Sequence, residues 1–264
     1  MRRPDRRGRW MLVALMGALI VAPCAQASDS QARRRSIEGV PDPAVAPYLA
    51  VGLVVVEMDD DSEDWCSGTA INSPSRELVL TAGHCLYEKQ CTRCRPISAR
   101  RVEFIPALSD GRAPYGTFIA RSWQVPQRWR REWFNDAYDV GAIRLSPNER
   151  GQNVADAVGG GIPIALDQPR KQTYQLIGYP GNFERMHQCE AQYDHNDPTA
   201  RFLSGPPPLG VGCYMGDGAS GGPWLINGGT EIDGLTSYSI GRDKAHTYGP
   251  YFSQATVGSL VAGL

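Results

Sequence analysis

Short runs of β-type sequence, separated by glycine and proline, are the feature that most limits what this chain can fold into. Glycine or proline stands in nearly every gap between them. Many short strands with such punctuation are typical of β-barrels and sandwiches rather than of βαβ units. The expected strands are 49–58, 66–71, 78–82, 102–105, 116–125, 140–145, 162–166, 174–179, 187–193, 211–214, 223–226, 232–238 and 247–252. With one expected helix, the tail 253–264, the sequence predicts an all-β fold.

The first 27 residues are predicted to be a secretory signal peptide. Five arginines precede an apolar run at 11–22, and an A-x-A cleavage site follows at 25–27. The apolar run is shorter than the roughly 18 residues that a membrane span needs. Lipidation of Cys24 is a weaker alternative, because Pro23 stands where a small residue is usual. We therefore expect a secreted protein, extracellular or periplasmic, with no membrane attachment after cleavage.

A polar lead-in at 28–47 follows, with three consecutive arginines at 33–35 and prolines at 41, 43 and 47. It is interpreted either as a removable pro-segment, cut near Arg35, or as a flexible lead-in. An arginine run of this kind is often only a solvated stretch.

Composition narrows the class of protein. A chain of 264 residues that is 42% hydrophobic can build one large or two small domains. Without residues 1–27, which carry five arginines and one aspartate, the formal charge of −1 becomes −5, which argues against a nucleic-acid partner. Six of the seven cysteines remain, an even number that indicates disulfides in an exported chain, with 15 connectivities open. They are Cys66, Cys85, Cys91, Cys94, Cys189 and Cys213.

The sequence Gly-Asp-Gly-Ala-Ser-Gly-Gly-Pro at 216–223 contains the candidate nucleophile, Ser220. Glycines on both sides of a serine suit a backbone that approaches a ligand closely, and they leave N–H groups free to bind an oxyanion. Such clusters also mark ordinary turns. The choice depends on whether a histidine and an acid stand elsewhere in a compatible order.

His84 and Asp139 supply that pair. His84 follows the apolar run 78–82 and precedes a cysteine, which can hold an imidazole rigidly at a strand end. Asp139 opens the apolar run 140–145. A lone histidine or aspartate at a strand end is usually structural, but a buried aspartate against an imidazole fixes its tautomer and stabilises the imidazolium.

These segments, in the order His84, Asp139 and Ser220, resemble the chymotrypsin-like serine proteases. Cys-Ser-Gly-Thr-Ala-Ile at 66–71 is similar to the strand before the family's histidine, and Leu-Thr-Ala-Gly-His-Cys at 80–85 is similar to its histidine motif. Asp-Val-Gly-Ala-Ile follows at 139–143. Subtilisins and α/β-hydrolases place their catalytic residues in other orders.

The resemblance implies two six-stranded antiparallel β-barrels, at 48–150 and 151–264, with the active site between them. Ser220 would be the nucleophile, His84 the general base and Asp139 its partner, while the N–H groups of Gly218 and Ser220 would form the oxyanion hole. A monomer that cleaves proteins or peptides, without cofactor or metal, is expected. A Cys66–Cys85 disulfide is also implied, and Cys91 then pairs most economically with Cys94, and Cys189 with Cys213.

One departure from the family concerns activation. Trypsin-type members carry an aspartate directly before the serine that pairs with a new N-terminus, but here Ala219 stands there and Asp217 lies two residues further back. The bacterial branch similar to glutamyl endopeptidases also lacks that aspartate. The segment 177–181 of this chain resembles a segment of that branch. We expect that trimming near Arg35 is not required to build the oxyanion hole.

Substrate specificity is a second departure. Counting back from Ser220 places Tyr214 at the floor of the specificity pocket, where an aspartate would select basic residues. The segment 235–239 resembles the wall of that pocket, with Ser237 near the buried carboxylate and Tyr238 and Ser239 beside it. The histidine of glutamate-selective members is absent. The sequence therefore predicts weak cleavage after arginine or lysine.

The sequence is also compatible with two other functions. An α/β-hydrolase esterase is disfavoured because only 44 residues follow Ser220. A catalytically silent binding protein of the same fold is the second alternative. For it, the basic aromatic stretch 128–133 would be a docking surface, although a solvated loop is favoured. The acidic segment 57–64 is expected to be a hairpin tip rather than a Ca²⁺ site, and 146–161 a linker between the halves.

Overall fold

The computed structural model describes residues 36–89, 91, 93–132, 135–181 and 184–262, and the predicted signal peptide and Arg33–35 lie outside this part. The strands are β1 (Glu38–Gly39), β2 (Val51–Met58), β3 (Glu63–Ala70), β4 (Leu78–Thr81), β5 (Tyr87–Glu88), β6 (Ile97–Pro106), β7 (Phe118–Gln124), β8 (Gly141–Leu145), β9 (Thr173–Gly178), β10 (His187–Asn196), β11 (Leu209–Val211), β12 (Pro223–Ile226), β13 (Glu231–Leu235) and β14 (Thr247–Gly249). The helical elements are η1 (Tyr48–Ala50), α1 (Gln127–Arg131), η2 (Asp136–Tyr138), α2 (Val154–Ala157), η3 (Ala200–Phe202), η4 (Gln254–Gly258) and α3 (Ser259–Ala262). Among the helices described, none is both long and apolar enough to span a bilayer.

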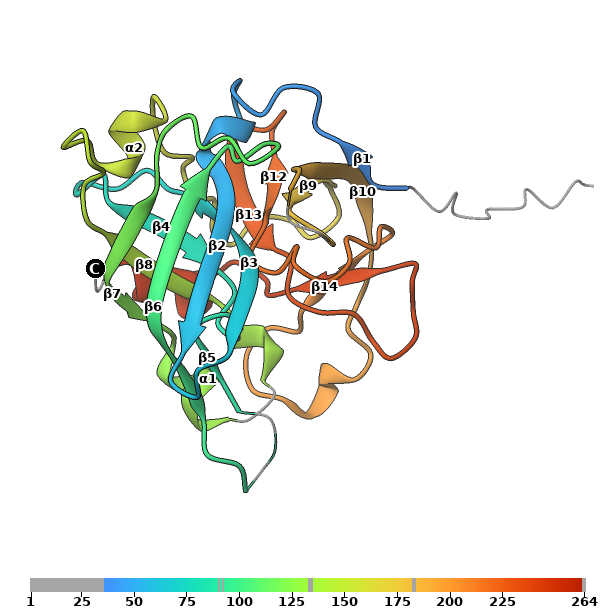
Figure 1. The fold of residues 1–264 in the computed structure, drawn as a ribbon. Helices are drawn as coiled ribbons and strands as arrows, with labels where there is room; N and C mark the ends of the chain where they lie inside the picture. The colour runs from blue at the N-terminus through green and yellow to red at the C-terminus, as the bar shows by residue number, and fades with distance from the viewer. Residues whose placement is uncertain (1–35, 90, 92, 133–134, 182–183, 263–264) are drawn as a thin grey trace, which may run out of the picture. The chain divides into compact units, whose positions relative to one another are not determined.

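Strands β2 to β8 form the first barrel. Their order is β2-β3-β4-β8-β7-β6, pairing of β2 with β6 closes the ring, and β5 joins the edge at β6 (Figure 1). The valine-rich β2 is buried along most of its length because it lies between β3 and β6. Gly52 permits the approach to β6, since a Cβ there would meet the Ile105 carbonyl oxygen at 2.6 Å.

The second barrel has the order β13-β12-β9-β10-β11-β14, and a single bridge between Tyr238 and Tyr248 links the chain beyond β13 to β14. The short strand β1 pairs with β10, so part of the expected lead-in adds to this barrel. The fold prediction is confirmed: two barrels of six strands, each with one short extra strand.

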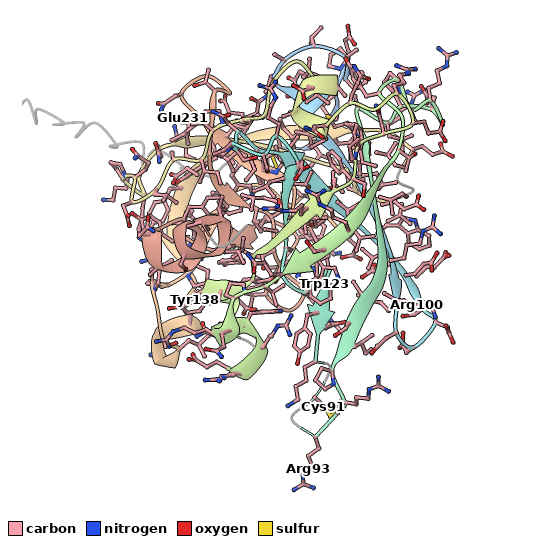
Figure 2. The ribbon with its side chains drawn as sticks, turned by 90° about the vertical axis from the view of Figure 1, so that its left-hand side faces the viewer. Cys91, Arg93, Arg100, Trp123, Tyr138 and Glu231 are labelled. Atoms are coloured by element: carbon pink, nitrogen blue, oxygen red, sulfur yellow. A yellow bond between two sulfur atoms is a disulfide. The ribbon has the colours of Figure 1, made fainter. Side chains whose placement is uncertain are left out.

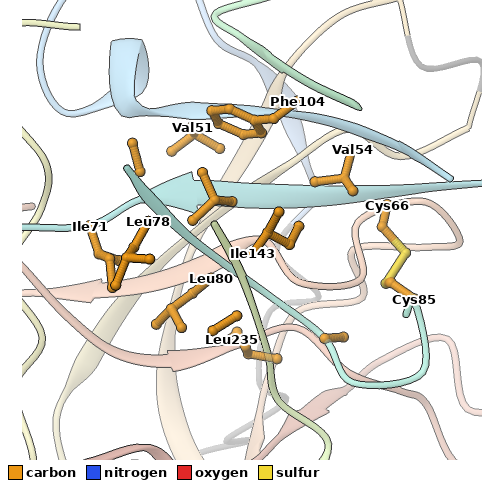
Figure 3. Close-up of a cluster of buried hydrophobic side chains, with 14 of the residues drawn as sticks. Val51, Val54, Cys66, Ile71, Leu78, Leu80, Cys85, Phe104, Ile143 and Leu235 are labelled. Carbon is orange, nitrogen blue, oxygen red and sulfur yellow. A yellow bond between two sulfur atoms is a disulfide. The ribbon is translucent and has the colours of Figure 1, made fainter. Parts of the chain in front are cut away.

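A continuous apolar core joins the two barrels. It contains β2, β3 and β4 residues of the first barrel together with Leu225, Ile232 and Leu235 of the second. Figure 3 shows Leu235 close to Leu80 and Ile143. Each fully buried aliphatic side chain of this kind contributes about 1.5–3 kcal/mol to folding. A smaller cluster fills the second barrel, where the rings of Tyr174 and Trp224 meet edge to face at 5.6 Å.

Two expectations about local structure need correction. Residues 162–166 form only isolated bridges, Ile71 with Ile162 and Ile164 with Ile232, because the segment crosses between partners in different barrels. Part of 128–133, expected as a loop, is the helix α1. The expected linker 146–161 lies between β8 and β9 and contains α2, whose Val154 and Ala155 are buried.

The hairpin tip and the C-terminal helix agree with expectation. Strands β2 and β3 pair up to Glu57 and Glu63, and carboxylates at the tip form ion pairs with arginines, as Asp61 does with Arg100 at 2.8 Å. At the C-terminus η4 runs into α3, and Ser253 and Thr256 cap the start by reciprocal hydrogen bonds.

Candidate active site

His84 lies on a turn directly after β4. The disulfide between Cys66 of β3 and Cys85 fixes this turn to the neighbouring strand (Figure 3). The backbone N–H of His84 donates to Asp139 Oδ1 at 2.7 Å, and its ring Nδ1 lies 2.7 Å from Asp139 Oδ2. One carboxylate therefore holds both the backbone and the ring of His84, and 26% of the histidine side chain is exposed.

Asp139 lies between η2 and β8 with 2% of its side chain exposed. The Ser237 hydroxyl also donates to Oδ2, as expected for a serine near the buried carboxylate. Burial by itself would raise the pKa of Asp139, but the charge of His84 and these hydrogen bonds lower it. Burial would likewise lower the pKa of His84, and the charge and hydrogen bond of Asp139 raise it. The pair favours Asp139 ionised and an imidazole that readily accepts a proton.

The loop that carries Ser220 lies against the turn that leads to His84. Gly221 has a φ of 82°, and a Cβ on it would meet Thr81 Oγ1 at 2.2 Å and the Ala82 nitrogen at 2.7 Å. Only glycine fits this close approach at positive φ. The glycine after the candidate nucleophile thus brings Ser220 beside the histidine turn, across the boundary between the barrels.

Ser67 of β3 fastens the same loop, a role that sequence reasoning missed although it had singled out the motif at 66–71. Its N–H donates to the Ser220 carbonyl at 2.7 Å, and its hydroxyl donates to the Gly218 carbonyl at 3.0 Å. The hydroxyl oxygen also accepts from the Tyr179 N–H at 2.8 Å. One serine of the first barrel therefore holds three backbone groups of the second.

The N–H groups of Gly218 and Ser220 donate to no group in the part of the chain that the structure describes. The peptide planes that carry them are held from the opposite side. The Asp217 carbonyl accepts from the Gly181 N–H at 3.0 Å, and the Ala219 carbonyl accepts from the Gly222 N–H at 2.9 Å. Because C=O and N–H point in opposite directions in a trans peptide, the N–H groups of Gly218 and Ser220 are turned away from the Gly181 and Gly222 donors and left open to a ligand.

Two hollows border these residues, and they share Ser237 and Tyr238. The larger, of about 220 Å³, is lined by His84 and Asp139, and the smaller, of about 50 Å³, by Ser220. All four residues predicted for the specificity pocket line the smaller hollow: Tyr214, Ser237, Tyr238 and Ser239. The structure thus pairs His84 with Asp139 in one hollow and places Ser220 with the expected pocket residues in the other, and Ser237 and Tyr238 line both.

The wall of the larger hollow includes residues without a predicted role. Tyr87 and Trp129 lie there, and the Trp129 indole donates to the Tyr87 carbonyl at 2.8 Å. Asp136 lines it too, and burial together with the nearby carboxylates of Asp139 and Asp197 raises the pKa of Asp136 to about 7. The basic aromatic stretch at 128–133 contains Trp129 and is the sequence signal for this part of the wall.

The six cysteines form three disulfides, Cys66–Cys85, Cys91–Cys94 and Cys189–Cys213, which are the pairings expected. Figure 2 shows Cys91 on a loop that projects from the first barrel, with Arg93 beyond it. The cysteines beside His84 are therefore bonded to each other and are not free to bind a metal.

Comparisons with known proteins agree with this arrangement. No protein-family model and no curated protein matches the sequence. Among solved structures, the protease Anisep from Arthrobacter nicotinovorans and the thermostable serine protease AL20 from an extremophilic microorganism each share 28% identity with this chain. Each match covers 81% of this chain and 96% of the other, with a TM-score of 0.70. A Glu endopeptidase has 18% identity, 86% and 96% coverage and a TM-score of 0.66. The fold and these serine protease neighbours support a chymotrypsin-like protease family for this chain.

Proposed function

We propose that the chain is a secreted serine endopeptidase that hydrolyses peptide bonds through an acyl-enzyme formed on Ser220. The observation that carries this proposal is the 2.7 Å contact between His84 Nδ1 and the buried carboxylate of Asp139, beside the loop of Ser220. Three disulfides support secretion, because such bonds persist in oxidising compartments.

In this mechanism the Ser220 hydroxyl oxygen attacks the scissile carbonyl carbon while His84 Nε2 takes the hydroxyl proton. Asp139 holds Nδ1–H and stabilises the imidazolium that results. The tetrahedral oxyanion receives hydrogen bonds from the N–H groups of Gly218 and Ser220, then collapses as His84 protonates the leaving amine. Water, deprotonated by His84, attacks the acyl-enzyme in the same way and frees Ser220.

The same contacts support the expectation that no new N-terminus is needed to form the oxyanion hole. The Gly181 N–H and the two donors of Ser67 hold the loop at 216–222, and these donors belong to the folded barrels. Residues 36–39 instead run along β10, where Glu38 and Gly39 pair with Gln188 and His187. A chain forced to begin well upstream of Arg35 should therefore be active without trimming, and inactivity until it is trimmed would contradict this.

The hollows suggest a substrate with neutral side chains next to the scissile bond. Tyr214 lines the smaller hollow and its hydroxyl is held by the ammonium of Lys244 at 2.7 Å, so a cation already lies beside it. Asp217 is the acidic residue that lines this hollow, and it is exposed. We expect weak cleavage after arginine and lysine, and efficient cleavage after either in a peptide library would contradict it.

Labelling with a fluorophosphonate tests the proposed nucleophile. The wild-type chain should be labelled by the fluorophosphonate, and the Ser220→Ala variant should remain unlabelled. His187→Ala serves as a control in which a histidine outside the proposed site is removed. Equal labelling of wild type and Ser220→Ala, or no labelling of either, would sink the assignment and favour a silent binding protein.

A further inference from the structure

A second group of histidines and carboxylates lies on the second barrel, and the protease mechanism does not use it. Asp194 and His195 stand near the end of β10, and His246 directly precedes β14. Strand β11 runs between β10 and β14, yet the rings of His195 and His246 are 5.2 Å apart. We call Asp194, His195 and His246 the histidine cluster.

Glycine 210 of β11 makes this approach possible. It pairs with His195 on one side and with Tyr248 on the other, so the three residues share one face of the sheet. A Cβ on Gly210 would meet the Tyr248 ring at 2.7 Å. The missing side chain lets the rings of His195 and Tyr248 meet over the strand, with 5.7 Å between their centroids.

Three donor atoms of the cluster converge on one point. Asp194 Oδ2 lies 2.9 Å from His195 Nδ1 and 3.0 Å from His246 Nε2, and suitable donor atoms of all three residues lie within 4.8 Å of one another. In a tetrahedral zinc site with bonds of about 2.0–2.1 Å, neighbouring donors lie about 3.3 Å apart. The two distances from Asp194 to the histidine nitrogens are within a few tenths of an ångström of this spacing, so a Zn²⁺ ion could bind two imidazoles and a carboxylate here.

The far side of each imidazole is also held. His246 Nδ1 lies 2.6 Å from Asp243 Oδ2, and His195 Nε2 lies 2.9 Å from the Tyr248 hydroxyl. Metal-binding histidines usually donate their second N–H to a carboxylate or another oxygen, which orients the ring and makes the ligating nitrogen more basic. Both rings here have such an oxygen, so the nitrogens that face Asp194 can be the unprotonated ones.

The surroundings of His246 favour a positive charge. Both ring nitrogens of His246 face carboxylates, Nδ1 facing Asp243 and Nε2 facing Asp194. An imidazolium, which has two N–H groups, would donate to both carboxylates. A divalent cation between Nε2 and Asp194 would supply the same positive charge while Nδ1–H donates to Asp243.

We propose that the histidine cluster binds one Zn²⁺ ion, and that the bound ion steadies one wall of the smaller hollow beside Ser220. The second part rests on the proposed protease function, whereas metal binding does not. The residue that follows His246 in the chain belongs to this wall. Thr247, next to His246, lines the hollow and its hydroxyl oxygen accepts from the Met215 N–H, and Tyr238 of the same hollow stacks on Tyr248 at 5.4 Å.

Metal binding is tested on the Ser220→Ala chain, which cannot digest itself. After treatment with EDTA, the protein is titrated with Zn²⁺ by calorimetry and with Co²⁺ by visible absorption. One equivalent of each should bind. His246→Gln and His195→Gln should weaken the affinity at least about 100-fold, and Asp243→Asn about 10–100-fold through the orientation of His246. His187→Gln, also on β10, is the matched control and should bind as its parent does.

Two results would overturn the site: no uptake of either ion at millimolar concentration, or equal uptake by the His246→Gln and His195→Gln variants. Thermal unfolding without metal checks that each variant folds, and the half-exposed Asp194→Asn variant repeats the test without changing a ring. Zn²⁺ should also raise the unfolding temperature of the parent and not that of His246→Gln, since a ligand that binds only the folded state stabilises it.

The link to the hollow is tested separately with the active enzyme and a peptide substrate. Zn²⁺ should lower KM about threefold to tenfold with little change in kcat, EDTA should reverse this, and His246→Gln should show no response. If Zn²⁺ binds and KM does not move, the ion does not act on the hollow. If no peptide is cleaved at all, the protease assignment fails while the binding result stands.

Discussion

The molecule contains two histidine–carboxylate groups with nearly the same contact distance and different surroundings. His84 faces one carboxylate, that of Asp139, at 2.7 Å, and its Nε2 has no partner in the described part of the chain. His246 faces Asp243 at 2.6 Å and has its Nε2 against Asp194 as well. Asp139 is 2% exposed and Asp194 is 55% exposed. A histidine that faces one buried carboxylate and has its other nitrogen free can pass a proton, whereas a ring between two carboxylates suits a cation.

The largest expected effect separates the two groups by activity. His84→Ala should lower kcat/KM for a peptide about 10⁶-fold, because the serine then has no base. Removing a histidine of the second barrel that neither group uses, in His187→Ala, should leave kcat/KM unchanged. Steady-state kinetics on purified variants checks this. A loss of only tenfold in kcat/KM for His84→Ala would show that His84 is not the base for Ser220.

The second test concerns Asp139, the one carboxylate that faces His84. Asp139→Asn should lower kcat about 10⁴-fold, because the amide no longer fixes the productive tautomer of His84. His84 must be neutral to accept the serine proton, and Asp139 raises its pKa above the ordinary 6.5. In the wild type, kcat/KM should therefore fall as the pH is lowered, with its midpoint above 6.5. The midpoint should move to lower pH in Asp139→Asn, and an unchanged midpoint would contradict the proposed pairing.

A smaller effect is expected from Ser67, which binds the loop of Ser220 from the other barrel. Ser67→Ala removes the hydroxyl that binds the Gly218 carbonyl and the Tyr179 N–H. Unpaired buried groups of this kind cost about 1–3 kcal/mol, so kcat should fall about 5-fold to 100-fold with KM little changed. Thr69→Val on the same strand is the matched control, since the Thr69 hydroxyl has no partner among the described residues. Equal effects of the two substitutions would exclude a specific role for Ser67.

The smallest expected effect concerns the stability of the fold and the buried carboxyl group of Asp233. Asp233 is fully buried with an amide, Gln172, as its partner, and burial raises its pKa to about 7. The folded state then binds a proton that the unfolded state, with a pKa near 3.8, has released, so stability falls as the pH rises from about 4 to 7.

Asp233→Asn removes this dependence. In the Ser220→Ala background it should raise the unfolding temperature at pH 8 relative to pH 4.5 by about 2–4 °C for each kcal/mol recovered. The exposed Glu149→Gln is the control and should show no such difference. An equal effect of Asp233→Asn at pH 4.5 and pH 8 would show that Asp233 does not change its charge between these pH values in the folded protein, which would contradict the raised pKa.

Sequence reasoning reached the parts of the site that short local motifs encode. His84, Asp139 and Ser220 each stand in a run of apolar or glycine residues that fixes a strand end or a tight loop, so their order was informative. The three disulfide pairings and the two-barrel fold followed from the same resemblance. The Ser237 contact with Asp139 was also predicted, since both segments belong to recognisable strands.

The rest depends on contacts between distant segments. The donors that hold the oxyanion loop come from Ser67 and Gly181, and nothing in their local sequence states which carbonyl each will meet. The histidine cluster was missed because Asp194 and His246 are 52 residues apart and meet only across a glycine of β11. The helix α1 was missed because its five residues expose arginines and carry no helical apolar stripe.

The bond between Ser67 and Gly218 joins residues 151 positions apart. At translation rates of about 5–20 residues per second, roughly 8–30 s separate the synthesis of these two residues. Until Gly218 and Ser220 have been made, a nascent chain that already carries His84 and Asp139 has no nucleophile, and Ser67 has no loop to bind. Proteolytic activity therefore arises only after Ser220 has been made, so shorter nascent chains cannot cleave one another.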